Sequence, residues 1–131
     1  MQPSLQPPGT AVALSPRVGI EKLTKEHVEA RALLASGDRE ALASLLRKHI
    51  RVEEDVLIPL LAGHLPTNTG PLAVLVREHR TILGLLAGQD TSRLGDMLLA
   101  HMAKEEELVY PFAAARLTAE DLARLGDGGR S

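Results

Sequence analysis

An internal repeat with an offset of 52 residues constrains this chain more than any other feature of its sequence. Residues 23–62 align with residues 75–114 without a gap, and 14 of the 40 aligned pairs are identical. Seven identical pairs are Leu or Ala, which any two helices rich in these residues can share. The other seven are Glu26/Glu78, His27/His79, Asp38/Asp90, His49/His101, Glu53/Glu105, Glu54/Glu106 and Pro59/Pro111. Such a duplication predicts two similar substructures that pack against each other.

Each repeat unit has the pattern of two helices joined by a tight turn. Apolar residues recur at steps of three and four, and only 2% of the residues are aromatic, which favours helices over sheets. Segments rich in Gly, Pro, Asn and Asp separate the periodic stretches. The predicted helices span about residues 16–35, 38–63, 71–87 and 90–115. They predict an all-α fold, an up-down-up-down four-helix bundle with a pseudo-two-fold repeat of helical hairpins.

The bundle is predicted to form one domain over residues 16–116. Residues 1–15 contain three prolines and lack both a positive start and an apolar run, so we expect a disordered arm and no signal peptide. Residues 117–131 predict a short C-terminal helix that begins with a capping box at Thr118, followed by a flexible tail. Pro59 and Pro111 lie late in two of the helices and are expected to kink their last turns.

Composition narrows the classes of function. The formal net charge is −2 with both signs interspersed, which provides no basic surface for nucleic acid or an anionic membrane. Charges, prolines or glycines interrupt every apolar segment before it is long enough to span a bilayer. The chain has no cysteine, so disulfides, thiolate zinc sites and iron–sulfur clusters are excluded. We expect a cytoplasmic protein in which any metal binds to nitrogen and oxygen.

Four histidines and two glutamates are the candidate metal ligands. His49 and Glu53 lie one helical turn apart and therefore share a face of their helix. His27 lies about as far before the turn of its hairpin as His49 lies after it, so both are expected at one level of the bundle. The second hairpin repeats this arrangement. Buried imidazoles and carboxylates need partners, and a dinuclear metal site would supply them. The predicted ligands are His27, His49, Glu53, His79, His101 and Glu105.

The ligand types limit the metal and the scaffold. Imidazole and carboxylate without thiolate suit iron, manganese or zinc, and the doubled set favours a bridged redox pair. The ferritin-like di-iron scaffold needs a Glu three residues before a His, and no histidine here has one. The sequence also lacks the His-Glu-x-x-His motif of zinc proteases.

The arrangement of these motifs resembles the hemerythrin-like family, also called the HHE cation-binding domain. The resemblance covers about residues 16–116. The segments that support it are Glu26-His27, His49 to Pro59, Glu78-His79 and His101 to Phe112. It implies a non-haem pair of iron ions with an oxo or hydroxo bridge, with Glu53 and Glu105 as bridging carboxylates and the four histidines as terminal ligands. Manganese and zinc are weaker candidates.

The resemblance leaves several functions open. Family members bind O2 reversibly, respond to oxygen or iron, react with nitric oxide or peroxide, or deliver iron, and the fold does not choose among these. The implied partner is a small diatomic molecule or peroxide, and the alternative is an oxygen- or iron-sensing or iron-handling module without turnover. Whether the chain is an enzyme and which oligomer it forms both stay open. Oxygen carriers have a fifth histidine where this sequence has Leu83, which favours reactivity over oxygen carriage.

Residues next to the candidate ligands have competing roles. Glu106 is an alternative to Glu105 as the second bridging carboxylate, and we favour Glu105 because it shares a face with His101. Tyr110 lies nine positions after His101, so we expect it on the opposite side of the helix as a packing residue. We expect Glu26, Glu78 and Arg31 either beside the ligands or on the solvated surface. We expect His64 at a helix end or in a loop.

Overall fold

The computed structural model describes residues 18–127. Within this range the regular structure is entirely helical, which confirms the predicted all-α class. The predicted arm at 1–15 and the last residues of the predicted tail, 128–131, lie outside the described range. The elements are α2 (Val18–Ser36), α3 (Arg39–Val52), η1 (Glu53–Leu57), α4 (Ile58–Leu61), α5 (Gly70–Ala87), α6 (Thr91–Lys104), η2 (Glu105–Val109), α7 (Tyr110–Arg116) and α8 (Ala119–Gly126).

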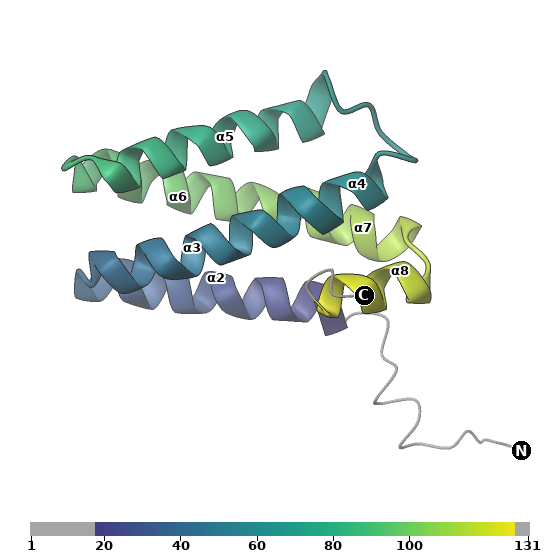
Figure 1. Cartoon of the computed structure of the whole chain (residues 1–131), viewed down its shortest axis with the longest axis horizontal. Coiled ribbons are helices and arrows are strands. Elements are labelled where there is room, and N and C mark those ends of the chain that lie inside the picture. The colour runs from purple at the N-terminus through teal and green to yellow at the C-terminus, as the bar shows by residue number, and fades with distance from the viewer. Residues whose placement is uncertain (1–17, 128–131) are drawn as a thin grey trace, which may run out of the picture.

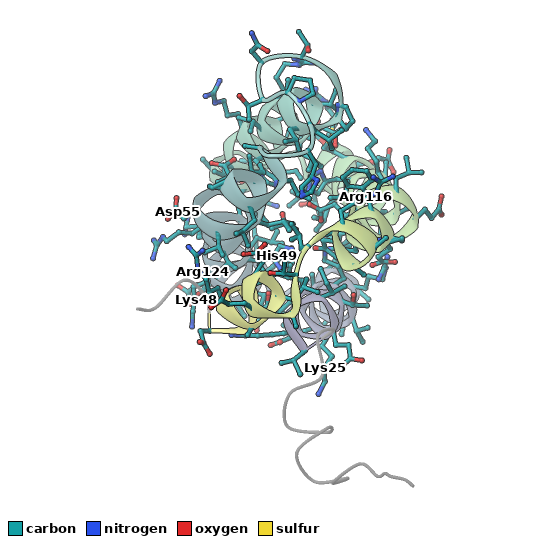
Figure 2. All side chains as sticks on the ribbon, turned by 90° about the vertical axis from the view of Figure 1, so that its right-hand side faces the viewer. Lys25, Lys48, His49, Asp55, Arg116 and Arg124 are labelled. Atoms are coloured by element: carbon teal, nitrogen blue, oxygen red, sulfur yellow. The ribbon has the colours of Figure 1, made fainter. Side chains whose placement is uncertain are left out.

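Four long helical segments lie side by side in a bundle (Figure 1). They are α2, then α3 with η1 and α4, then α5, then α6 with η2 and α7. α2 packs against α3, α5 against α6, and α3 against α5, while α8 lies against α2. Seen along the bundle, Lys25 and Asp55 lie at the periphery and His49 lies among the helices (Figure 2). No helix in the described range is long and apolar enough to cross a bilayer.

Aspartates begin the second helix of each hairpin. Oδ1 of Asp38 accepts a hydrogen bond from the backbone N–H of Ala41 at 3.1 Å, and Oδ1 of Asp90 accepts one from Arg93 at 2.9 Å. These bonds satisfy amide groups that have no partner inside the helix. Thr118 caps α8 in the same way, as the sequence predicts. Because the two aspartates are partners in the repeat, α3 and α6 begin at equivalent positions. Their histidines therefore lie at the same level along the bundle.

A π-helical turn stands just before each of the two prolines at which the sequence predicts a kink. Proline cannot donate to the carbonyl four residues earlier and its ring clashes with that carbonyl, so the α-helical ladder is already broken there. The N–H of Ile58 instead reaches the carbonyl of Glu53, five residues earlier, and Tyr110 makes the same bond to Glu105. Each wide turn thus begins at a candidate ligand.

Two apolar clusters fill the bundle on either side of a polar layer. The first contains Leu23, Val56, Leu75 and Val109, and the second contains Ala30, Leu46, Ile82 and Leu98, each with further residues. Along α2, His27 lies between Leu23 of the first cluster and Ala30 of the second. The candidate ligands therefore occupy a layer that apolar side chains close off at both ends.

The contact between α2 and α8 depends on Gly19. A Cβ at this position would lie 2.7 Å from the carbonyl oxygen of Leu122 and 2.8 Å from the backbone nitrogen of Gly126. We expect Gly19→Ala to lower the free energy of unfolding by about 1–3 kcal/mol, because backbone atoms must move to admit the methyl group. Gly84→Ala is the control: its Cβ would meet open space, so a gain of roughly 0.4–1 kcal/mol is expected. Urea denaturation measures both, and equal effects would contradict the packing argument.

Candidate metal centre

Six polar side chains meet in the layer between the two apolar clusters, and each is at most 3% exposed. They come from α2, α3, η1, α5, α6 and η2, so every long segment of the bundle contributes. They are His27, His49, Glu53, His79, His101 and Glu105. The structure brings together all six residues that the sequence predicts as ligands, and their binding of a metal stays a prediction. His64 is exposed and belongs to neither group of candidate ligands among the described residues.

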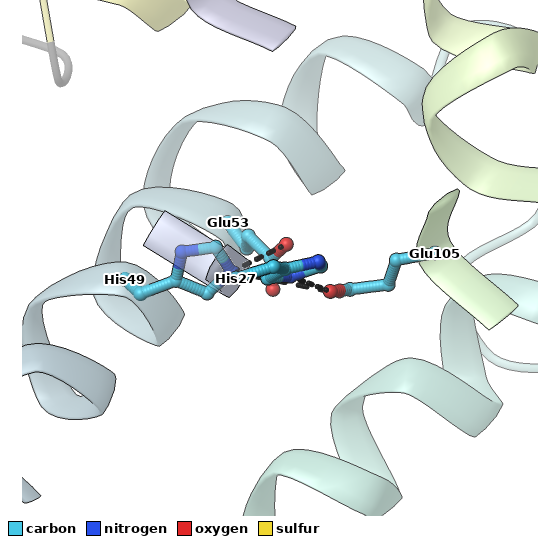
Figure 3. A group of neighbouring side chains, drawn as sticks. All are labelled: His27, His49, Glu53 and Glu105. Atoms are coloured by element: carbon cyan, nitrogen blue, oxygen red, sulfur yellow. Dashed lines mark hydrogen bonds and ion pairs between the residues drawn. The ribbon is translucent and has the colours of Figure 1, made fainter. Parts of the chain in front are cut away.

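The first donor group consists of His27, His49, Glu53 and Glu105 (Figure 3). Nε2 of His27 lies 3.2 Å from Nε2 of His49 and 3.0 Å from Oε1 of Glu105. Nε2 of His49 lies 3.2 Å from Oε2 of Glu53. One ligand atom from each residue lies within 4.8 Å of all the others. Nitrogen and oxygen atoms bound to one metal ion at about 2.0–2.2 Å have separations of this size.

The second donor group contains His79 and His101 with the same two glutamates. Nε2 of His79 lies 2.9 Å from Oε1 of Glu53, and Nε2 of His101 lies 3.2 Å from Oε2 of Glu105. Each carboxylate therefore turns one oxygen toward each group. The layer offers two adjacent positions for a cation, and both positions share the same pair of carboxylates.

A carboxylate contacts the other ring nitrogen, Nδ1, of each of these four histidines. Such a hydrogen bond places the proton of a neutral imidazole on Nδ1 and leaves the Nε2 lone pair toward the centre. Two contacts lie within a hairpin and two join one hairpin to the other. They are His49 to Glu26 at 2.7 Å, His101 to Glu78 at 2.8 Å, His79 to Glu54 at 2.7 Å and His27 to Glu106 at 2.6 Å. All four rings are thus oriented as metal-binding histidines usually are.

The geometry favours Glu105 over Glu106 as the shared carboxylate. Glu105 is fully buried between the two donor groups. Glu106 lies outside them, where it accepts hydrogen bonds from Nδ1 of His27 and from Nη2 of Arg31 at 3.0 Å. Arg31 is therefore at the rim of the site, one of the two places that the sequence allowed for it.

Three other glutamates lie beside the histidines, and the sequence identified only two of them as candidates. Glu26 and Glu78 could have been solvated, but both contact a histidine, and Glu78 also pairs with Lys104. Glu54 was missed, although its identity with Glu106 in the repeat was a signal. Its partner is a histidine of the other hairpin, and the sequence does not show which residues meet across the hairpins.

The prediction that Tyr110 faces away from the ligands is wrong. Its side chain is buried, and its hydroxyl donates a hydrogen bond to Oε2 of Glu53 at 2.5 Å and lies 3.2 Å from Oε1 of Glu105. The prediction assumed 3.6 residues per turn along the whole helix. Because η2 is π-helical, residues five apart such as Glu105 and Tyr110 lie above one another on the inner face.

The electrostatics of the layer favour positive charge at its centre. Burial opposes a charge on His79, yet the nearby carboxylates of Glu105 and Glu53 raise the pKa of the imidazole to about 10. Burial also opposes a charge on Glu105, but the surrounding histidines, His101 and His27 first among them, hold the pKa of its carboxyl well below its usual range. Burial and the two carboxylates raise the pKa of the Tyr110 hydroxyl well above its usual range. A metal ion that binds here must displace protons.

The short distances between donor atoms indicate that the layer suits a cation. His27 and His49 both direct a proton on Nδ1 toward a carboxylate, so in neutral rings their Nε2 atoms face each other at 3.2 Å with two lone pairs. Nε2 of His101 and Oε2 of Glu105 are buried 3.2 Å apart and have no hydrogen-bond partner among the described residues. Each unsatisfied buried polar atom costs about 1–3 kcal/mol. Metal ions that prefer nitrogen and oxygen ligands would satisfy these atoms.

Together, these features define an all-helical protein with a buried His/Glu site that is able to hold metal ions. Residues 18–92, more than half of the chain, match the family model described as the Hemerythrin HHE cation binding domain. The chain belongs to this family, as its motifs indicate. The match includes four of the six predicted ligands, while His101 and Glu105 lie beyond it. No curated protein and no solved structure matches the chain.

Proposed function

We propose that this chain is a non-haem di-iron protein that binds or reacts with O2, peroxide or nitric oxide. The observation that supports this most strongly is the pair of donor groups that share Glu53 and Glu105. Two ions with shared carboxylates can act together on one small molecule. Iron suits mixed imidazole and carboxylate donors, whereas zinc has no redox chemistry of its own, and manganese is a weaker candidate.

The residues of the chain would hold the ions and exclude water. The two histidines of each donor group would bind one ion, and Glu53 and Glu105 would be shared between the ions. The carboxylates at Nδ1 keep each ring in the orientation for binding. The apolar clusters above and below the layer keep bulk solvent away. When bound, the two iron ions would supply the one-electron chemistry that O2, peroxide and nitric oxide require.

Leu83 supports reactivity over oxygen storage. It lies on α5 one turn after His79, where the oxygen-carrying hemerythrins have their fifth histidine. Its side chain has no donor atom and packs against the second apolar cluster. The ion held by His79 and His101 would then have few protein ligands and a free position for an external ligand, as metal ions in catalytic sites do.

The proposal includes the symmetry of the bundle, an up-down-up-down order of helices related by a pseudo-two-fold axis. The contacts that support it come in pairs with an offset of 52 residues. They are His49–Glu26 with His101–Glu78, and His27–Glu106 with His79–Glu54. A site with two equivalent halves is what two facing copies of one hairpin would produce.

Anaerobic reconstitution with ferrous iron tests the proposed function. We expect about two iron ions per chain, since each donor group would hold one. Stopped-flow mixing with O2, peroxide or nitric oxide is then expected to change the absorption spectrum. His64→Ala is the control and should keep its iron, because His64 is exposed and outside both groups. A chain that binds no iron contradicts the proposal. If the chain binds iron but its spectrum changes with none of O2, peroxide and nitric oxide, the function is that of the sensing or iron-handling module.

A further inference from the structure

Tyr110 breaks the symmetry of the polar layer. It is buried and is the only tyrosine of the chain. The residue at the same position of the first repeat unit is Ile58, which is also buried but has no donor atom. The two donor groups are otherwise built from matching residues. One side of the centre therefore has a phenol oxygen where the other side has a hydrocarbon side chain.

The phenol oxygen is close to every donor atom of the first group. It lies 2.5 Å from Oε2 of Glu53, 3.2 Å from Oε1 of Glu105, 3.2 Å from Nε2 of His27 and 3.4 Å from Nε2 of His49. Ligands of one ion, bound at about 2.0–2.2 Å, stand roughly 3 Å from their neighbours. The Tyr110 oxygen thus has the position of a fifth ligand, relative to these four atoms.

The hydrogen bond to Glu53 accounts for one of these four contacts, and the contacts to His27 and His49 depend on where the protons of those rings lie. A phenol has one proton, and Tyr110 uses it for Glu53. In neutral rings, His27 and His49 have their proton on Nδ1, so their Nε2 lone pairs face a phenol oxygen that has no second proton to offer. The longer contact to Glu105 competes for the same single proton, because the hydroxyl already donates it to Glu53 at 2.5 Å. If a cation lay among these atoms, all four contacts would be ordinary distances between neighbouring ligands of that cation.

We infer that the Tyr110 oxygen is a fifth protein ligand of the ion held by His27 and His49. The inference rests on the proposed function, because it requires that this ion binds. The phenol gives up its proton to solvent when the cation binds, as thiol and imidazolium ligands do. The ion held by His79 and His101 has no such ligand, since Ile58 and Leu83 lack donor atoms. The two ions are therefore inequivalent, and an external ligand binds the second one.

Optical spectroscopy of the ferric protein tests this inference without an activity assay. Phenolate bound to ferric iron gives a visible charge-transfer band, and excitation in that band enhances the ring vibrations of the tyrosinate in resonance Raman spectra. Because Tyr110 is the only tyrosine, such a band in the full chain has one source. We expect the band in the unmodified protein and its complete loss in Tyr110→Phe, with about two iron ions bound in both. Two bound iron ions without the band, or a band that persists in Tyr110→Phe, would overturn the inference.

Two further measurements make the result independent of how Tyr110→Phe folds. Replacement of tyrosine by 3-fluorotyrosine in the unmodified sequence should shift the band, and an unshifted band would overturn the assignment. Exchange of the two positions, Tyr110→Ile with Ile58→Tyr, should restore the band by supplying a phenol to the other donor group. Iron analysis separates the two proposals. Iron without the band overturns only the role of Tyr110, whereas a chain that binds no iron overturns the proposed function as well.

Discussion

Glu105→Gln is expected to abolish the binding of both metal ions at once. Glu105 is fully buried and turns one carboxylate oxygen toward each donor group. The amide keeps the size of the side chain but removes its charge, and its NH2 group cannot bind a cation. Each ion would lose an anionic ligand in a layer that excludes water, where charge compensation matters most. Iron analysis after anaerobic reconstitution and desalting should find no bound iron, against about two ions in the unmodified chain.

Glu106→Gln is the matched control, since it makes the same change at the next residue. Glu106 accepts a hydrogen bond from Nδ1 of His27 but contributes no atom to either donor group. Loss of such a supporting carboxylate typically weakens metal binding by about 10- to 100-fold without abolishing it. The variant should therefore keep both ions when iron is in excess. If Glu106→Gln lost its iron and Glu105→Gln kept it, the shared carboxylate would be Glu106, the alternative that the sequence allows.

Helix positions were predictable because they depend on local chemistry. Asp38, Asp90 and Thr118 each supply a side-chain oxygen at the start of a helix, and all three make a capping bond. The π-helical turns were not predictable from the same pattern. The period of apolar residues is nearly the same on both sides of a single wide turn, and only Pro59 and Pro111 indicated that the helices change there. This one local change moved Tyr110 from the predicted outer face to the centre.

The buried site could be predicted as far as the repeat could define it. His27, His49 and Glu53 each have an identical residue 52 positions later, and their spacing around a turn of known position sets their height in the bundle. The same distinction applies to the carboxylates that contact Nδ1 of the histidines. Glu26 and its repeat partner lie within a hairpin, where sequence spacing applies, and the sequence identified both as candidates. The contact between Glu54 and the opposite hairpin depends on how the hairpins face each other, which is a property of tertiary packing.

Metal binding is expected to raise the melting temperature by a large amount, because the polar layer lies in the middle of the core. An ion at 100 times its dissociation constant stabilises the folded state by about 2.7 kcal/mol, so two ions contribute roughly 5 kcal/mol. For a domain of this size, that corresponds to a rise of roughly 10–20 °C. Differential scanning calorimetry of the chain with ferrous iron under anaerobic conditions, and with a chelator, measures the difference.

Histidine variants divide this stabilisation between the two donor groups. His101→Ala removes a ligand from the second group only, so about half of the metal-dependent rise should remain. The double variant His49→Ala with His101→Ala removes one imidazole from each group and should show no rise. Each variant is compared with itself with and without iron, so the cavity left by the missing ring does not enter the comparison. A melting temperature of the unmodified chain that iron does not change would mean that the buried histidines and glutamates serve the bundle without a metal. An equal rise in the double variant would place the ions elsewhere in the chain.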